Sequence, residues 1–193
     1  MSRNLEIETK GFLTKEEYEL ILSHFKDEKP YVQTNYYIDT DKFKVRLLGC
    51  GLRVREKEGK FELTLKVKEG DGKLEINQDI TKSEFESILN KTSFPDGEVK
   101  DYLINMLGVN TSKLFVFASM ETTRLDIPFN SSLISVDKSI CLGETDYELE
   151  CESADLETAT KDITKFLKKF GLKYKKFSAT KLRRAIERYQ KAQ

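Results

Sequence analysis

Charged and apolar residues alternate in several short stretches of this sequence, and the alternation constrains the fold more than any other feature. In the first stretch, residues 5–10, a strand would place Glu6, Glu8 and Lys10 on one face. Two carboxylates about 7 Å apart on such a face repel each other unless a cation lies between them. Carboxylates at this spacing can hold a hard divalent cation through their oxygens.

The same pattern returns further along the chain. Arg53 and Arg55 share a face in one strand of a predicted hairpin, and Lys66 and Lys68 share a face in the other. The charged faces of later predicted strands carry Glu75, Arg124, Asp137, Glu148 and Glu150. Because mostly tight turns separate these stretches, we expect about eight strands in one antiparallel sheet, and not a βαβ fold.

Amphipathic helices are predicted between the strands. Thr14 with Glu17, and Thr81 with Glu84, form capping boxes that open two of them. Helical spacing predicts further helices over residues 99–107, from 155 to 170 and from 178 onward, whereas residues 43–48 are predicted to be extended.

These helices need an apolar surface to cover, and the apolar faces of the strands provide it. The charged faces then line the interior of a closed sheet. We therefore predict an α+β fold, an eight-stranded antiparallel β-barrel or tunnel with a charged lumen and helices packed outside, in a single domain over residues 1–193. Enclosed like charges need neutralisation, which a polyanion together with a divalent cation would supply.

The bulk composition excludes several classes of protein. Lys plus Arg equals Asp plus Glu, 33 each, so no excess charge points to nucleic acid or to a membrane surface. No apolar stretch suits a signal peptide or a membrane span. The three cysteines show no CxxC spacing, which predicts buried reduced thiols in a cytoplasmic protein. A single histidine, His24, excludes a histidine-rich zinc site. We expect a monomer or a homodimer.

The stretch from Glu6 to Lys10 resembles the ExExK signature of the CYTH superfamily, the triphosphate tunnel metalloenzymes. Further matching parts follow in the family's order over nearly the whole chain: Arg53, Arg55, the strand that ends at Lys66, Arg124, Asp137, Glu148, Glu150 and Lys181. The resemblance implies an eight-stranded tunnel that acts on small-molecule triphosphates with Mg²⁺ or Mn²⁺.

The resemblance also implies roles for individual residues. Metal ligation would fall to Glu6, Glu8, Glu148 and Glu150, with Asp137 as a further candidate. The residues that would hold phosphate oxygens and support catalysis are Lys10, Arg53, Arg55, Lys66, Arg124 and Lys181. Lys68 and Arg183 are added to the substrate-binding set, Lys68 on strand parity alone.

Phosphoryl transfer asks mainly for positioning and charge neutralisation, which suits a site without histidine or a reactive cysteine. The preferred function is a divalent-metal-dependent hydrolase that splits inorganic tripolyphosphate into pyrophosphate and phosphate. The predicted lumen is polar and has no evident aromatic lining for a base. The alternatives are a class IV adenylate cyclase, a thiamine triphosphatase, and a non-catalytic binder of polyphosphate or of triphosphate-ended RNA.

Overall fold

The computed structural model describes residues 2–70, 72–177 and 179–193. Its strands form one sheet in which all neighbours are antiparallel. The strands are β1 (Ser2–Glu6), β2 (Glu8–Phe12), β3 (Tyr31–Asp39), β4 (Cys50–Lys57), β5 (Lys60–Glu69), β6 (Gly72–Ile80), β7 (Phe115–Phe129), β8 (Ser132–Cys141) and β9 (Glu144–Glu152). Their order in space is β1-β6-β5-β4-β3-β7-β8-β9-β2.

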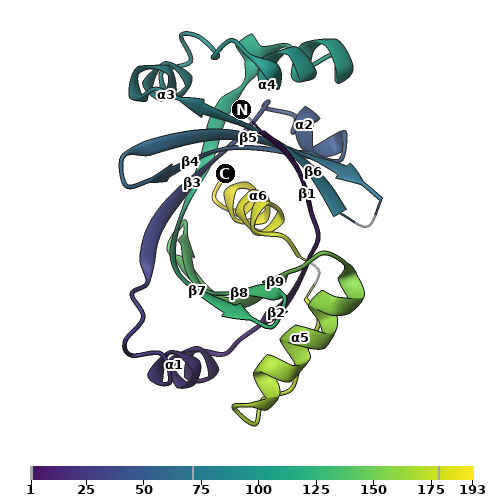
Figure 1. Ribbon diagram of the computed structural model, residues 1–193. Helices are drawn as coiled ribbons and strands as arrows, with labels where there is room; N and C mark the ends of the chain where they lie inside the picture. The colour runs from purple at the N-terminus through teal and green to yellow at the C-terminus, as the bar shows by residue number, and fades with distance from the viewer. Residues whose placement is uncertain (1, 71, 178) are drawn as a thin grey trace.

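The two edge strands of this sheet are joined through a single residue, Ile7. β1 pairs with β6, where Leu5 lies opposite Leu74, and β2 pairs with β9, where Lys10 lies opposite Glu150. Because β1 and β2 are consecutive in the chain, the sheet curls until its edges meet along one segment, and Figure 1 shows the resulting ring. The predicted antiparallel tunnel is confirmed. Its opening strand is divided in two, which gives nine strands in place of eight.

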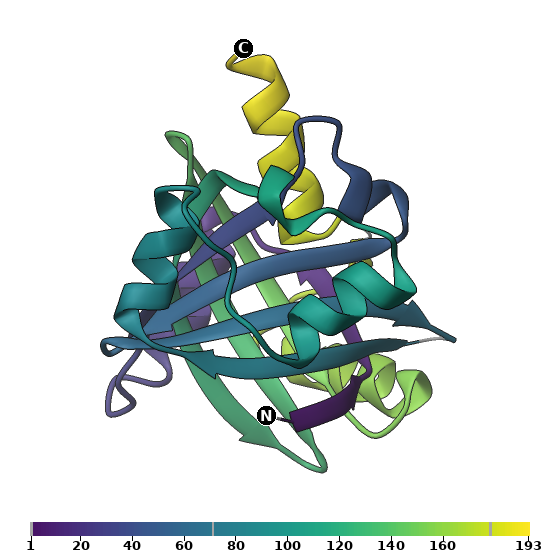
Figure 2. The ribbon, with the colours of Figure 1, turned by 90° about the horizontal axis from the view of Figure 1, so that it is seen from above.

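Helices cover the outside of the ring on two opposite sides (Figures 1 and 2). One layer packs over β5, β6 and β7, and the other over β8, β9 and β2. The first layer consists of α3 (Lys82–Leu89), α4 (Glu98–Asp101) and the π-helical segment Tyr102–Met106 that continues α4. The second consists of α1 (Lys15–Ser23) and α5 (Leu156–Lys168). A 3₁₀ turn at Thr111–Lys113 leads into β7.

Each helix layer packs on the apolar outer face of the strands beneath it. Phe85 of α3 belongs to a buried cluster with Leu63 of β5 and Ile76 of β6. On the opposite side, Phe166 of α5 belongs to a second cluster with Leu149 of β9. Because neighbouring residues of a strand point to opposite faces, the charged residues between these positions point into the tunnel, as predicted.

Both predicted capping boxes are present. The N–H of Glu17 donates to Thr14 Oγ1 at 3.2 Å, and the N–H of Thr14 donates to Glu17 Oε2 at 2.8 Å. Thr81 and Glu84 make the equivalent pair at 3.2 and 2.7 Å. The boxes fix the first turns of α1 and α3, and so set where the outer helices begin.

The prediction that residues 43–48 are extended is wrong. They contain the short helix α2 (Lys44–Leu47). The carboxylate of Asp39, at the end of β3, accepts the backbone N–H groups of Val45 and Arg46, each at 2.9 Å. These contacts satisfy donors that a first helical turn leaves free. The helix therefore depends on a side chain that precedes it by several residues.

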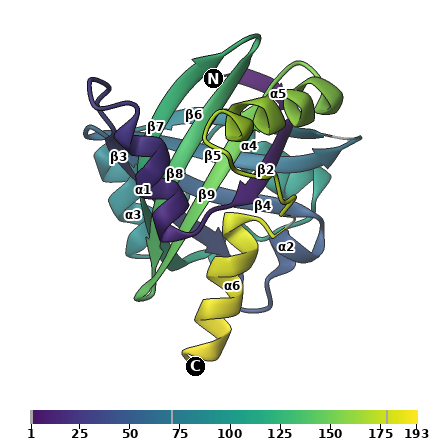
Figure 3. The same cartoon turned by 90° about the horizontal axis from the view of Figure 1, so that it is seen from below.

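The last helix, α6 (Lys181–Lys191), belongs to neither outer layer. It lies at one end of the tunnel and projects out of it, as Figures 2 and 3 show. In Figure 1 the same helix appears within the ring, because that view looks along the tunnel. Its N-terminal turn brings the side chain of Lys181 against strands β8 and β9.

Two further observations bear on the sequence predictions. Cys50, Cys141 and Cys151 are all buried and free of disulfide bonds, as predicted. Within the described part of the chain, no helix is long and apolar enough to cross a membrane.

Candidate active site

A cavity lies inside the tunnel. Its lining draws on strands β1, β2, β3, β4, β5, β6, β7 and β9 and on the start of α6. The predicted site residues that line it are Glu6, Glu8, Lys10, Arg53, Arg55, Lys66, Arg124, Glu150 and Lys181. Strand parity placed eight of these nine residues in the lumen, whereas Lys181 was predicted from the family resemblance.

The remaining predicted residues lie in three different places. Asp137 and Glu148 are fully buried and lie behind the cavity lining. Lys68 is exposed and lines a second, wider cavity next to the first. Arg183 lies on the exposed face of α6, where its Nε donates to Glu187 at 2.8 Å, and it lines neither cavity.

Three carboxylates converge at one side of the cavity: Glu150 of β9 in its lining, with Asp137 of β8 and Glu148 of β9 behind it. Asp137 lies directly opposite Glu148 in the β8–β9 register, and Glu150 is the next inward residue of β9. Each offers one oxygen, and these oxygens lie within 4.8 Å of one another. Lys181 Nζ lies 2.6 Å from Asp137 Oδ2 and 3.0 Å from Glu150 Oε1, and it also pairs with Glu148.

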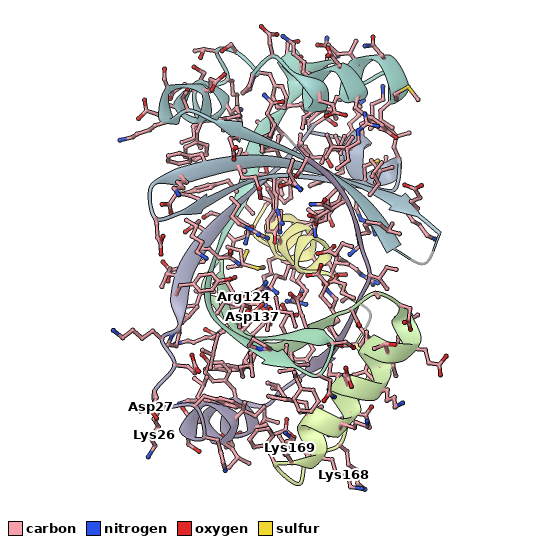
Figure 4. The ribbon with its side chains drawn as sticks, in the orientation of Figure 1. Lys26, Asp27, Arg124, Asp137, Lys168 and Lys169 are labelled. Carbon is pink, nitrogen blue, oxygen red and sulfur yellow. The ribbon has the colours of Figure 1, made fainter. Side chains whose placement is uncertain are left out.

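Arg124 of β7 closes this cluster from the other side. It lies opposite Asp137 in the β7–β8 register, and Figure 4 shows the two side chains together inside the ring. Its Nε donates to Asp137 Oδ1 at 2.7 Å, and its Nη2 lies 2.6 Å from Asp137 Oδ2. Nη2 also donates to Glu150 Oε2 at 2.6 Å. Despite burial, which opposes a charge, Asp137 and Glu150 raise the pKa of Arg124.

The carboxylate cluster fits a hard divalent cation such as Mg²⁺ or Mn²⁺. Its donors are all oxygens, which these ions prefer, and it contains neither histidine nor cysteine. Glu148 Oε1 is buried and has no hydrogen-bond partner among the described residues, although Lys181 approaches it as an ion pair. A metal ion would take the place of Lys181 at this oxygen.

A second group of charges lies around the ends of β1 and β6. Lys66 Nζ donates to Glu6 Oε2 at 2.7 Å and pairs with Glu75. Lys73 Nζ donates to Glu8 Oε1 at 3.0 Å. These contacts place Glu6 and Glu8 on the cavity wall with lysines as their partners in this ligand-free arrangement.

Lys10 connects the two groups. Its Nζ lies 3.1 Å from Glu8 Oε1 and 3.2 Å from Glu150 Oε1. Burial and Glu150 oppose the charge on Glu8, but Lys10, Lys73 and Lys66 outweigh them and hold the pKa of Glu8 at about 2. Burial also opposes the charge on Glu150, yet Lys181, Lys10 and Arg124 hold its pKa well below the usual range. Both carboxylates are therefore ionised at neutral pH.

Arg53 and Arg55 of β4 differ from the other cations of the lining. Neither forms an ion pair within the described part of the chain, and Arg53 Nε is buried without a hydrogen-bond partner. Arg55 Nε reaches only Asn35 Oδ1, at 3.4 Å. Repulsion from Arg53, followed by burial and by Arg124, lowers the pKa of Arg55 to about 10. Two uncompensated guanidinium groups facing one cavity form a binding site for an anion.

Several residues of the site were not predicted from the sequence. Lys73 lines the cavity beside Glu8. It lies two residues before Glu75 in β6 and so shares its inward face, which was the available signal. Tyr37 of β3 also lines the cavity, so the expectation of a lining without aromatic residues is wrong. Its ring is 4% exposed, and its hydroxyl donates to Met120 Sδ.

Arg184 and Arg188 of α6 are the other unpredicted residues, and both are buried. They follow Lys181 at spacings of three and seven residues, which places all three on one face of a helix. This spacing was the available signal. It becomes informative only when the helix is known to lie against the carboxylates of β9.

The second cavity opens beside the first and is the wider of the two. The two share Glu6, Glu8, Lys10 and Lys66 on their common wall. Residues that line only the second cavity include the cations Arg46, Lys68 and Lys176 and the apolar Leu156 and Phe177. The inner cavity therefore adjoins a wider space with a more mixed lining.

Taken together, the fold and the lining define a class of protein: a closed antiparallel tunnel whose interior gathers cationic side chains against clustered carboxylates. The chain belongs to the CYTH domain family, whose model matches residues 4–186.

Two relatives are similar over most of their length. The chain is 36% identical to YjbK, a candidate triphosphatase of Bacillus subtilis (strain 168), over 89% of this chain and 90% of that protein. It is 33% identical to a candidate adenylate cyclase from Bacillus halodurans, whose crystal structure superimposes with a TM-score of 0.87 over 95% of this chain and 98% of that one.

The fold extends to a more distant protein. HpAC1 from Hippeastrum, a candidate adenylyl cyclase with a dominant triphosphatase activity, superimposes with a TM-score of 0.77 at 19% identity. The match covers 94% of this chain and 95% of that one. At this identity the likeness concerns the fold.

Proposed function

We propose that this protein is a divalent-metal-dependent hydrolase that splits inorganic tripolyphosphate into pyrophosphate and phosphate. The observation that carries the proposal is the pair Arg53 and Arg55, which face the cavity without an ion pair to any described carboxylate. A polyanion bound there would relieve the repulsion that lowers the pKa of Arg55. Similarity to YjbK supports a triphosphate as the polyanion.

In this proposal the cations of the lining hold the substrate. Arg53 and Arg55 grip phosphate oxygens with their planar guanidinium groups, and Lys10, Lys66 and Lys181 add positive charge around the chain of phosphates. Arg124 contributes from the side of Asp137. These groups orient the terminal phosphate and stabilise the negative charge that spreads over its oxygens in the transition state.

The carboxylates hold the metal. Asp137, Glu148 and Glu150 would provide oxygen ligands on one side of the cavity, and Glu6 and Glu8 on the other. A bound Mg²⁺ or Mn²⁺ neutralises phosphate charge and assists the attack of water. Because Glu8 and Glu150 have lowered pKa values, no proton has to leave them at neutral pH before the metal binds.

The charges of the ligand-free protein are arranged for an exchange of partners. Lys181 and Lys10 pair with the same carboxylates that would hold the metal. With a substrate bound, Lys181 and Lys10 would contact phosphate oxygens in place of these carboxylates, and the carboxylates would be available as ligands for the metal ion. In this exchange the buried carboxylates and the buried lysines each keep a partner of opposite charge.

A class IV adenylate cyclase is the second candidate. The relative from Bacillus halodurans at 33% identity is a candidate adenylate cyclase, and the second cavity provides room for a nucleoside. Against it, the aromatic residues of the linings are already engaged. Phe177 packs edge-on to Phe12 with ring centroids 4.1 Å apart, and the hydroxyl of Tyr37 is bonded to Met120.

The test is product identification with several substrates. Purified protein is incubated with tripolyphosphate, ATP or thiamine triphosphate, each with Mg²⁺, Mn²⁺ or EDTA, and products are measured by ³¹P NMR and mass spectrometry. We expect pyrophosphate and phosphate from tripolyphosphate, faster than turnover of ATP, with no turnover in EDTA. Cyclic AMP as the main product would reject the hydrolase, and so would full turnover in chelator. Binding of polyphosphate without products would indicate a non-catalytic protein.

A further inference from the structure

Arg184 lies one turn into α6 and is only 6% exposed. Each nitrogen of its guanidinium group has a partner. Nη2 donates to Glu148 Oε2 at 2.8 Å, Nε donates to Asp146 Oδ2 at 2.9 Å, and Nη1 donates to the carbonyl of Ala179 at 2.9 Å. The group also lies over the rings of Phe12 and Phe177, 5.5 and 5.6 Å from their centroids. Its orientation is therefore fixed from several directions.

Glu148 is the only one of these partners that belongs to the carboxylate cluster. Its side chain is 0% exposed. One oxygen, Oε2, accepts from Arg184. The other, Oε1, pairs with Lys181, whose Nζ also lies 2.6 Å from Asp137 Oδ2 and 3.0 Å from Glu150 Oε1. Because a carboxylate is planar and rigid, a fixed Oε2 also fixes the direction of Oε1.

We propose that Arg184 is a positioning residue for the metal site: it holds Glu148 so that Oε1 is presented to the metal ion. This inference rests on the metal assignment made under the proposed function. Arg184 lines neither cavity, so it does not touch the substrate. It acts through Glu148, as groups that hydrogen-bond a metal-ligating carboxylate do.

The exchange of partners gives Arg184 a second reason to be present. Among the described residues, the ion-pair partners of Glu148 are Lys181 and Arg184. When Lys181 turns to the phosphates, Arg184 remains as the cation that pairs with Glu148 and holds it in place. A buried carboxylate without any cation would be costly until the metal arrived.

Arg188 provides a matched control in the same helix. Its side chain is 8% exposed, close to the 7% of Arg184, and it also joins α6 to β9. Its Nη2 donates to Asp146 Oδ1 at 2.7 Å, and its Nε donates to Glu144 Oε2 at 3.1 Å. It makes no contact with Glu148. A variant at Arg188 therefore loosens α6 without releasing the metal-site carboxylate.

The experiment compares Arg184→Lys with Arg188→Lys by titration of Mn²⁺ in the absence of substrate, followed by electron paramagnetic resonance. The melting temperature of each variant reports its fold. A lysine keeps the charge but cannot contact Glu148, Asp146 and Ala179 together. We expect Arg184→Lys to weaken Mn²⁺ binding about 10- to 100-fold. The Mn²⁺ affinity of Arg188→Lys should stay close to that of the wild type, even if the two variants lower the melting temperature by the same amount.

A double-mutant cycle identifies the route of the effect. In a Glu148→Gln background, Arg184→Lys should cost no further Mn²⁺ affinity if it acts through Glu148. Asp146→Asn is a second control that does not require an Arg184 variant to fold. The asparagine loses the charge that anchors Arg188, but it keeps a side-chain oxygen that can accept from Arg184 Nε. The contact of Arg184 with Glu148 therefore remains, and Mn²⁺ affinity should be retained.

Three results would overturn the inference: equal losses in the Arg184 and Arg188 variants, full Mn²⁺ affinity in Arg184→Lys, or a large loss in Asp146→Asn. Absence of Mn²⁺ binding by the wild-type protein would instead reject the metal assignment itself. Because the assay measures binding without turnover, these outcomes are distinguishable from failure of the proposed hydrolysis.

Discussion

Lys181 Nζ lies 2.6 Å from Asp137 Oδ2, in the centre of a carboxylate cluster built by two strands that are distant from it in the chain. Burial opposes the charge on Lys181, but Asp137, Glu150 and Glu148 outweigh it and raise its pKa. Lys181 therefore stays charged at neutral pH and neutralises the cluster from inside. A metal ion that used the same carboxylates would compete with it.

This arrangement predicts that metal and substrate stabilise the protein more together than separately. Metal alone would leave Lys181 and Lys10 without partners, and a polyanion alone would do the same to the carboxylates. We expect the rise in melting temperature with Mg²⁺ and tripolyphosphate together to exceed the sum of the two separate rises, as measured by differential scanning fluorimetry. Arg53→Ala with Arg55→Ala should remove most of the excess. Strictly additive shifts would contradict an exchange of partners.

Variants on the two sides of the cavity should separate chemistry from binding. Glu150→Gln keeps the shape of the side chain and removes a metal-ligating charge, so kcat should fall more than KM rises. Arg55→Ala removes a phosphate contact that also holds transition-state charge, so kcat/KM should fall about 100-fold or more. Steady-state kinetics on tripolyphosphate measures both, with the exposed Lys165→Ala of α5 as control. Small, equal effects at Glu150 and Arg55 would place the site elsewhere.

The pKa of Glu8 predicts a loss of stability in acid. It is about 2 in the folded protein against a usual value of 4.5, so ionised Glu8 stabilises the fold above pH 4.5. That contribution disappears as the pH falls from 4.5 to about 2. Removing a cation by Lys73→Met should raise the pKa of Glu8 and flatten the decline, as measured by urea unfolding across this range.

The matched control for this prediction is Lys82→Met on α3. Lys82 lies 3.8 Å from Glu86 in an exposed pair that is distant from the cavity. Its substitution removes the same charge and should leave the slope of stability against pH unchanged. A change of slope of the same size in both variants would mean that net charge, and not the environment of Glu8, controls the acid loss.

The sequence predicts a site residue when that residue belongs to a strand whose inward face is charged. Glu8, Lys10, Arg53 and Arg55 were found because strand parity is strict and their apolar neighbours need cover from helices. Tyr37 was missed because the inward face of β3 carries uncharged residues, which produce no comparable pattern.

The other residues that the sequence did not predict correctly depend on how distant parts of the chain pack together. Arg184 shares a helical face with Lys181, but that face could equally have met solvent, and only the packing of α6 against β9 makes it part of the site. Arg183 illustrates the same limit. It follows Lys181 by only two residues, but two residues along a helix is more than half a turn, so its side chain lies on the opposite, exposed face. The short helix α2 depends on Asp39, which no local pattern within residues 43–48 contains.

The two lysines of β5 should differ in their importance for tripolyphosphate. Lys66 lines the inner cavity and pairs with Glu6 and Glu75, whereas Lys68 is exposed and lines only the wider cavity beside it. Lys66→Ala removes a partly buried charge-assisted contact, which leaves Glu75 unpaired among the described residues and Glu6 with only Lys73, at 3.9 Å, so kcat/KM should fall about 100-fold. Lys68→Ala removes a solvent-screened charge, so kcat/KM should stay within about five-fold of the wild type. Steady-state kinetics at two salt concentrations tests both, since only the small effect of Lys68 should vanish at high salt. If Lys68→Ala proved as damaging as Lys66→Ala, the substrate would have to extend into the wider cavity, and a longer or larger triphosphate compound would replace tripolyphosphate as the preferred substrate.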